Sequence, residues 1–284
     1  MKKYYLPLII GLTCLSLSGC SFFQKEEVKA DESWSVERIY SEAKAALDIA
    51  DYSKAITYYE QLEARFPFGE YAQQALLESA YAHYKSDDPE TAIATIDRFM
   101  RVYPLNPNID YAIYLRGLVN FHRDIGLLEK YIPRDESQRD PGAAEDALRD
   151  FNTLIQRFPT SRYAEDAAQR IVYLRNRLAQ HEVNVANYYM RRGSYLAALN
   201  RGKYVIENYD RTPAMPEALV VMAKAYKVLG MLELSEDSLR VLRINYPGHP
   251  GIAEVAQTEV QKTKTKKPVV EHSATGFFYA YSIN

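Results

Sequence analysis

The feature that most constrains the fold is a short motif, an aromatic residue followed by proline, that recurs along the chain. Proline cannot continue a helix, so each copy predicts a helix end. The copies are Phe66-Pro67, Tyr103-Pro104, Phe158-Pro159 and Tyr246-Pro247, and Tyr209-Asp210 stands where a further one would fall. Five helix ends at related spacings indicate an internal repeat.

The residues before each motif show which helix face is buried. A small residue lies twelve positions before the second motif residue, and mostly bulky residues follow it four and seven positions later, on the same helix face. The small residues are Ala55, Ala92, Ala147, Ala198 and Ser235. A second set of small residues lies further upstream and predicts another helix before each of these. The set is Ala43, Ala80, Ala186 and Ala223, with Gly117 in the third unit. We therefore expect an all-α fold, a superhelical array of five tetratricopeptide-like helical hairpins over roughly residues 34–260.

The spacing between motifs is uneven, at 37, 55, 51 and 37 residues. Segment 124–142 contains Gly126 and Pro133 and predicts a protruding loop, after which Asp140-Pro141 restarts a helix with Asp140 as N-cap. Residues 163–192 contain neither Gly nor Pro and predict one elongated helix. Because Asp210 replaces proline, the fourth helix end is expected to be less sharply defined than the others.

The N-terminus has the pattern of a secretory signal. Two lysines precede an apolar run of 14 residues, which is short of the roughly 20 that span a membrane. The run ends in Leu17-Ser18-Gly19-Cys20, which resembles the lipobox of bacterial lipoproteins and implies cleavage before Cys20 and lipid on its thiol. Ser21, in place of Asp, implies sorting to the outer membrane. Cys14 is the only other cysteine, so the mature chain has no disulfide and depends on a packed core.

These patterns divide the chain into five segments. They are a signal peptide at 1–19, a lipidated flexible tether at 20–33, the first three repeats at 34–160, the elongated helix with repeats four and five at 161–260, and a basic and aromatic flexible tail at 261–284.

Charge and motif content exclude several functions. Lys and Arg number 35 against 37 Asp and Glu, which leaves no broad cationic surface for nucleic acid. The five histidines are far apart in sequence, and the glycine and serine motifs of common catalytic sites are absent. We expect no metal, no cofactor beyond the lipid on Cys20, and no enzymatic activity.

Aromatic residues are the distinctive component, with 24 Tyr and 10 Phe. Tyr59, Phe66, Phe151 and Phe158 are assigned to the core, and residues off the packing face of the first helices are expected to line a groove on the concave side. Flat rings with hydroxyl groups suit a peptide with aromatic side chains of its own, although packing between repeats would also use them. The groove set is Tyr40, Lys44, Leu77, Tyr81, Tyr84, Lys85, Tyr111, Tyr114, Phe121 and His122.

The lipobox, five repeats, a loop ending in Arg139-Asp140-Pro141 and an elongated helix together resemble the BamD (ComL) family, lipoproteins of the outer-membrane β-barrel assembly (BAM) machinery. The resemblance implies a non-enzymatic scaffold at the periplasmic face of the outer membrane. The first three repeats would recognise unfolded barrel precursors, whose last strand ends in an aromatic residue. The last two would dock the POTRA region of BamA through Arg201, and the other BAM lipoproteins would be further partners.

Other functions remain open at this stage. A different periplasmic repeat lipoprotein, such as a pilus-assembly pilotin or a cell-division coordinator, would share the anchor and the fold. A cell-wall enzyme would need a catalytic cluster formed by distant residues. The tail after residue 261 departs from the family pattern.

Overall fold

A computed structural model describes residues 30–123 and 140–259. Cys20, with the signal peptide and most of the tether, lies outside these ranges, as do the inserted segment 124–139 and the tail 260–284. Within the described ranges the regular structure is helical throughout, which confirms the all-α fold class. None of the helices in these ranges is both long and apolar enough to cross a membrane.

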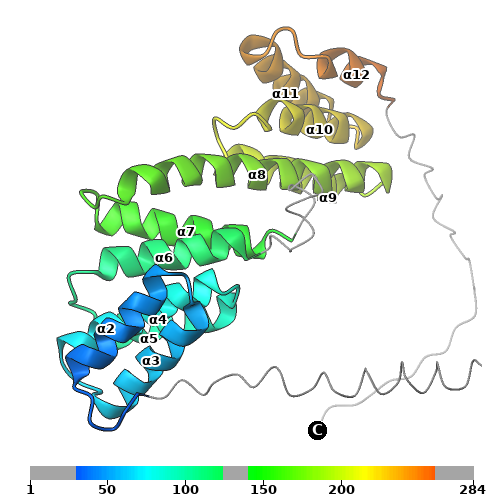
Figure 1. Ribbon diagram of the computed structural model, residues 1–284. Coiled ribbons are helices and arrows are strands. Elements are labelled where there is room, and N and C mark those ends of the chain that lie inside the picture. Colours follow the sequence, from blue (N-terminus) through cyan, green and yellow to red (C-terminus); the bar gives the residue numbers. More distant parts are fainter. Residues whose placement is uncertain (1–29, 124–139, 260–284) are drawn as a thin grey trace, which may run out of the picture. The chain divides into compact units, whose positions relative to one another are not determined.

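The helices follow one another as antiparallel pairs (Figure 1). Their bounds are α2 Val36–Asp48, α3 Tyr52–Arg65, α4 Glu70–Lys85, α5 Pro89–Val102, α6 Ile109–His122, α7 Gly142–Arg157, α8 Ala164–Arg191, α9 Tyr195–Asn208, α10 Met215–Val228, α11 Leu232–Asn245 and α12 Gly251–Gln257. The first ten make the five expected hairpins, and α8 is the expected elongated helix.

The small residues lie at the helix contacts, as expected. Ala55, Ala92, Ala147 and Ala198 are fully buried, and so are the four alanines of the first helices. Gly117 on α6 has no room for a larger residue, because a Cβ there would lie 2.6 Å from Cε1 of Phe151 on α7. Because these positions carry only a methyl group or a hydrogen atom, the two helices of a pair approach closely.

Each second helix ends at its aromatic residue. The N–H groups of Phe66, Tyr103, Phe158 and Tyr246 donate to the carbonyl four residues before, at 2.7–2.9 Å. Tyr209 does the same at 2.9 Å, so the fourth helix closes with the same hydrogen bond as the others although proline is absent. Arg211, at φ +59°, turns the chain there, and the Thr212 hydroxyl donates to the Tyr209 carbonyl at 2.8 Å. A residue with left-handed backbone conformation and a side-chain hydrogen bond thus end the helix here, where proline does so in the other repeats.

Two local details differ from expectation. Helix α7 begins at Gly142, with Pro141 as the N-cap residue, while the Asp140 carboxylate accepts from the Gly142 N–H at 2.8 Å. The seven-residue α12 was not expected. It forms because Val255 joins the apolar cluster of α10 and α11, and because Lys227 of α10 donates to the carbonyls of Val255 and Ala256.

The chain divides into two compact units, 1–178 and 179–284, with the boundary inside α8. The first unit has a core around Ile39, Ala43, Tyr59 and Leu62. The second has a core around Leu219, Ala223, Leu239 and Leu242. Each unit therefore has an apolar interior of its own.

Candidate functional site

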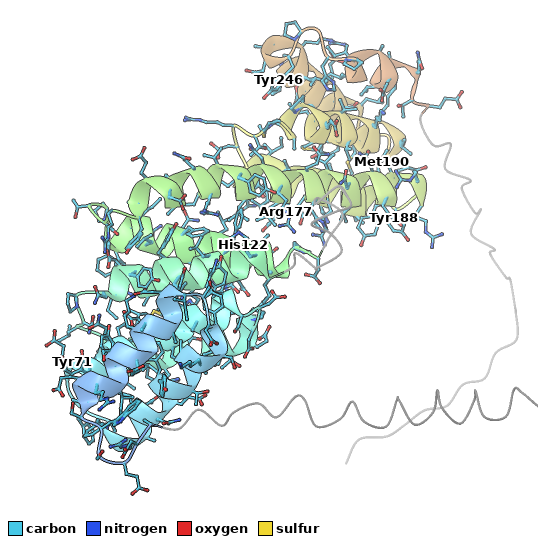
Figure 2. All side chains as sticks on the ribbon, viewed as in Figure 1. Tyr71, His122, Arg177, Tyr188, Met190 and Tyr246 are labelled. Carbon is cyan, nitrogen blue, oxygen red and sulfur yellow. The ribbon has the colours of Figure 1, made fainter. Side chains whose placement is uncertain are left out.

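Two surfaces stand out, one in each unit. The first we call the aromatic surface, made by half-buried or exposed rings on the first helix of successive hairpins in 1–178, together with Tyr163, which immediately precedes α8. It comprises Tyr40, Tyr71, Tyr81, Tyr84, Tyr111, Tyr114, Phe121, His122, Tyr163 and Tyr173. Tyr71 and His122 are labelled in Figure 2.

Glu78 organises the α2 end of the aromatic surface. Its carboxylate accepts from the hydroxyls of Tyr40 at 3.0 Å and Tyr59 at 2.5 Å. The ring of Tyr71 lies 5.3 Å from that of Tyr40. Burial, with the Glu78 carboxylate next, raises the pKa of Tyr40 well above its ordinary value, so the phenol remains a neutral donor. Lys44 lies 3.3 Å from Asp48 and 4.0 Å from Glu78.

A stack forms where α6 meets the start of α8. The rings of Tyr114 and Tyr163 are stacked at 4.7 Å, and Tyr111 lies 5.4 Å from Tyr163. The Tyr114 hydroxyl donates to Asp166 at 2.7 Å, and burial raises the pKa of Tyr114 to about 12. Burial alone would raise the pKa of Asp166, but hydrogen bonds from Arg170 and Tyr114 outweigh it and hold that pKa below its usual range.

The remaining rings continue the surface toward the C-terminal ends of α4 and α6. Tyr81 lies 6.3 Å from Tyr84, whose hydroxyl is 3.0 Å from Nδ1 of His122. Phe121 contacts Tyr173 at 5.5 Å, and the Arg170 guanidinium lies over the Phe121 ring at 4.9 Å. The rings are held in place by contacts with one another and by polar partners.

The structure corrects one member of the expected groove set. Leu77 is only 5% exposed and packs in the core, because its position on α4 faces the neighbouring helices. Lys85 is exposed, with its ammonium 6.0 Å from the Tyr84 ring. The other expected members lie on the aromatic surface or, as Lys44 does, beside its Glu78 end.

Sequence reasoning missed Tyr71, Tyr163 and Tyr173, and the acids that hold the hydroxyls, Glu78 and Asp166. A signal existed for Tyr173, because it lies on the elongated helix, which is the first helix of the fourth hairpin. No local pattern marks Glu78, whose partners lie 19 and 38 residues away.

The second surface, which we call the Arg201 surface, lies in the unit 179–284. Nη1 of Arg201 on α9 lies 3.1 and 3.0 Å from the two oxygens of Glu182 on α8. Its side chain is 46% exposed, whereas that of Glu182 is 9% exposed. Tyr189, Ala197, Asn200 and Tyr204 join Arg201 around a depression of about 370 Å³.

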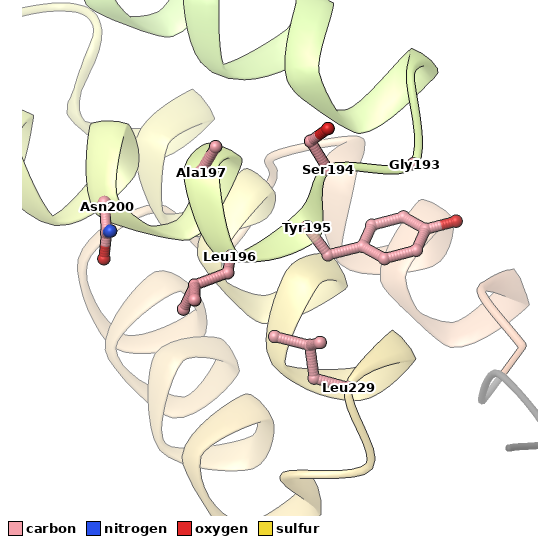
Figure 3. Close-up of a pocket in the computed structure, with 7 residues that line it drawn as sticks. All are labelled: Gly193, Ser194, Tyr195, Leu196, Ala197, Asn200 and Leu229. Carbon is pink, nitrogen blue, oxygen red and sulfur yellow. The ribbon is translucent and has the colours of Figure 1, made fainter.

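A second depression adjoins the first and shares Ala197 and Asn200 with it. It has a volume of about 560 Å³ and is lined by Gly193, Ser194, Tyr195, Leu196, Ala197, Asn200 and Leu229 (Figure 3). Leu196 is 61% exposed. Arg201 therefore lies beside a surface with exposed apolar side chains, and Leu229, from the end of α10, is a part that sequence reasoning missed.

Comparison with known proteins identifies the relatives of this chain. Residues 32–241 match the family described as outer membrane lipoprotein, YfiO. Outer membrane protein assembly factor BamD of Neisseria gonorrhoeae is 42% identical over 261 residues, which cover 91% of this chain and 97% of the relative. The chain belongs to the BamD family. The BamD of Neisseria meningitidis serogroup B is 44% identical, over 88% of this chain and 93% of the relative. The BamD of Xylella fastidiosa Temecula1 is 38% identical, over 87% and 83%.

Proposed function

We propose that this chain is a non-enzymatic scaffold that assembles outer membrane proteins within the BAM complex. The observation that carries the proposal is membership of the BamD family along almost the whole length of the relatives, whose name is outer membrane protein assembly factor. A pilotin or a division coordinator is disfavoured on the same ground. The chain would be held at the periplasmic face of the outer membrane by lipid on Cys20, beside the other BAM lipoproteins.

The aromatic surface would bind unfolded outer membrane protein precursors. The hydroxyls of Tyr40, Tyr84 and Tyr114 are engaged by Glu78, His122 and Asp166, so these three rings have fixed orientations before any ligand arrives. Rings ordered in advance lose little conformational entropy on binding, and they favour partners that present aromatic side chains. The aromatic residue that ends the last strand of a barrel precursor is such a partner.

The Arg201 surface would dock the POTRA region of BamA. Among the described residues, Arg201 uses only Nη1 in its pair with Glu182, so the guanidinium keeps another edge for a carboxylate of the partner. Exposed Leu196 and Tyr204 supply apolar and aromatic area beside that charge. An arginine next to aromatic and aliphatic side chains is typical of the residues that dominate binding at interfaces.

The experiment that tests both parts is affinity capture of the full acylated chain from detergent-solubilised envelope. Arg201→Glu is expected to lower co-purification of BamA about tenfold or more while precursor binding persists, since loss of a central arginine costs about 2 kcal/mol. The double variant Tyr81→Ala/Tyr173→Ala is expected to lower precursor binding while co-purification of BamA persists. Lys203→Ala, an exposed cation on the same helix as Arg201, is the control and should change neither. Unchanged BamA recovery with Arg201→Glu would remove the docking assignment.

A further inference from the structure

The unit 1–178 has one edge where the loops between successive hairpins lie together. The Asn106 side chain donates to Gln73 at 2.7 Å, which joins the α5–α6 loop to the first turn of α4. The Ser161 hydroxyl donates to Asp110 at 2.7 Å, which joins the α7–α8 loop to the first turn of α6. We call this the loop edge and define it by segments 31–34, 66–69, 103–108 and 158–163.

The chain also enters the fold at the loop edge. The guanidinium of Arg65, the last residue of α3, donates to the carbonyls of Asp31 at 3.0 Å, Glu32 at 2.7 Å and Trp34 at 2.9 Å. The Trp34 ring packs 6.0 Å from that of Tyr58. The Ala30 N–H also donates to the Gln61 side chain on α3 at 2.6 Å. Residues 30–34, the described part of the segment that leads back toward Cys20, are therefore fastened to the last turns of α3 at this edge.

The loop edge carries the two most exposed large apolar side chains of the described residues. Phe68 is 87% exposed and Leu105 is 95% exposed. Each follows the helix-ending proline of its repeat, so they occupy equivalent positions in consecutive repeats. A single exposed apolar residue is ordinary, but two at equivalent positions on one edge indicate a surface that is covered in use.

Arginines paired with aromatic rings lie in or next to the segments of the same edge. The guanidinium of Arg65 lies 5.3 Å from the Phe66 ring, that of Arg157 lies 5.3 Å from Phe158, and that of Arg162 lies 5.1 Å from Tyr163. Aromatic rings and long cationic side chains are the combination favoured at the headgroup level of a bilayer. The chemistry of the edge therefore fits a lipid surface.

We propose that the loop edge rests on the membrane that holds the acyl chains, with Phe68 and Leu105 in the headgroup region. The inference rests on the proposed acylation of Cys20. Ala30 lies ten positions after Cys20, and ten fully extended residues span at most about 35 Å, so this edge stays within that distance of the lipid anchor. The acyl chains and the apolar loop tips together would set which end of the hairpins faces the lipid.

A fluorescent label tests the proposal in the full mature chain, acylated and bound to vesicles of phosphatidylethanolamine and phosphatidylglycerol. Cys14 leaves with the signal and Cys20 carries lipid, so Phe68→Cys or Leu105→Cys introduces a unique free thiol for an environment-sensitive dye. Ile49→Cys is the matched control. Ile49 is apolar and 76% exposed but lies at the opposite end of α2, about 20 Å along a 13-residue helix.

The expected result is a blue shift of the dye at positions 68 and 105, with quenching by spin-labelled lipid several-fold stronger than at position 49. Circular dichroism checks that each labelled chain is helical. If the chain floats with the vesicles but all three dyes report water, the inference is overturned while the anchor stands. If the chain does not float, the proposed acylation fails and the inference falls with it.

Discussion

At the scale of single residues, the close approach of helices depends on positions that have no room for a side chain. Gly117 on α6 faces the fully buried ring of Phe151 on α7. Gly202 on α9 is similar, since a Cβ there would lie 2.7 Å from Cγ of Met222 and 3.2 Å from the carbonyl oxygen of Ala218. Glycine is costly within a helix, and here it is retained because of the neighbouring helix and not because of backbone conformation.

Gly117→Ala is expected to destabilise the protein. Alanine favours the helix by about 1 kcal/mol, but overpacking against Phe151 costs about 1–3 kcal/mol, so the net loss is about 1 kcal/mol. Thermal unfolding followed by circular dichroism measures the change. Gly248→Ala, where the added Cβ meets no atom within 4 Å, is the control and should shift the midpoint little. A higher midpoint for Gly117→Ala would contradict the close contact.

At the scale of helices, Arg116 joins three consecutive elements. Its Nη1 contacts Asp97 on α5 at 2.6 Å, and its Nε and Nη2 contact Asp150 on α7 at 3.0 and 2.7 Å. Asn120, one turn further along α6, donates to the other oxygen of Asp150 at 2.9 Å. The Asp150 side chain is 4% exposed, whereas that of Asp97 is 43% exposed. The network therefore holds α6 to α7 mainly through Asp150.

Asp150→Ala is expected to lower the free energy of unfolding by about 3–5 kcal/mol, since it leaves the Arg116 charge partly buried without its main partner. Asp97→Ala removes the exposed half of the same network and should cost about 1 kcal/mol or less. Urea denaturation of both variants gives the comparison. Equal losses in the two variants would show that burial of Asp150 is not what makes its pair important.

At the scale of the whole molecule, the chain has two compact units, and α8 is a single helix that contributes residues to both. The core of the first unit includes Leu62, and that of the second includes Leu242, and both side chains are fully buried. In such a chain, the free energy of local opening depends on how well the core of that unit is packed.

Leu62→Ala and Leu242→Ala are therefore expected to act locally. Each removes buried apolar volume and should destabilise its own unit by about 2–5 kcal/mol. Hydrogen exchange read by mass spectrometry should show lost protection in α2 and α3 for Leu62→Ala, and in α10 and α11 for Leu242→Ala. Equal loss of protection in both units from either substitution would show that they unfold as one.

The helical class, the five hairpins and the ends of their second helices could all be predicted from the order of residues alone. These features are local, because helix periodicity and the hydrogen bond from each aromatic N–H involve residues within one or two turns. Small residues at regular spacings likewise identified the buried faces. Even the fourth helix end falls where the aromatic residue predicts, although proline is missing there.

The composition of the two surfaces, in contrast, depends on contacts between helices that are distant in sequence. Leu77 was expected among accessible residues and is buried, while Glu78, its neighbour, holds two tyrosine hydroxyls. Arg201 pairs with Glu182 from another helix. Such partners lie 19 to 38 residues apart in sequence, and which of them meet depends on how neighbouring hairpins pack, which no local pattern encodes.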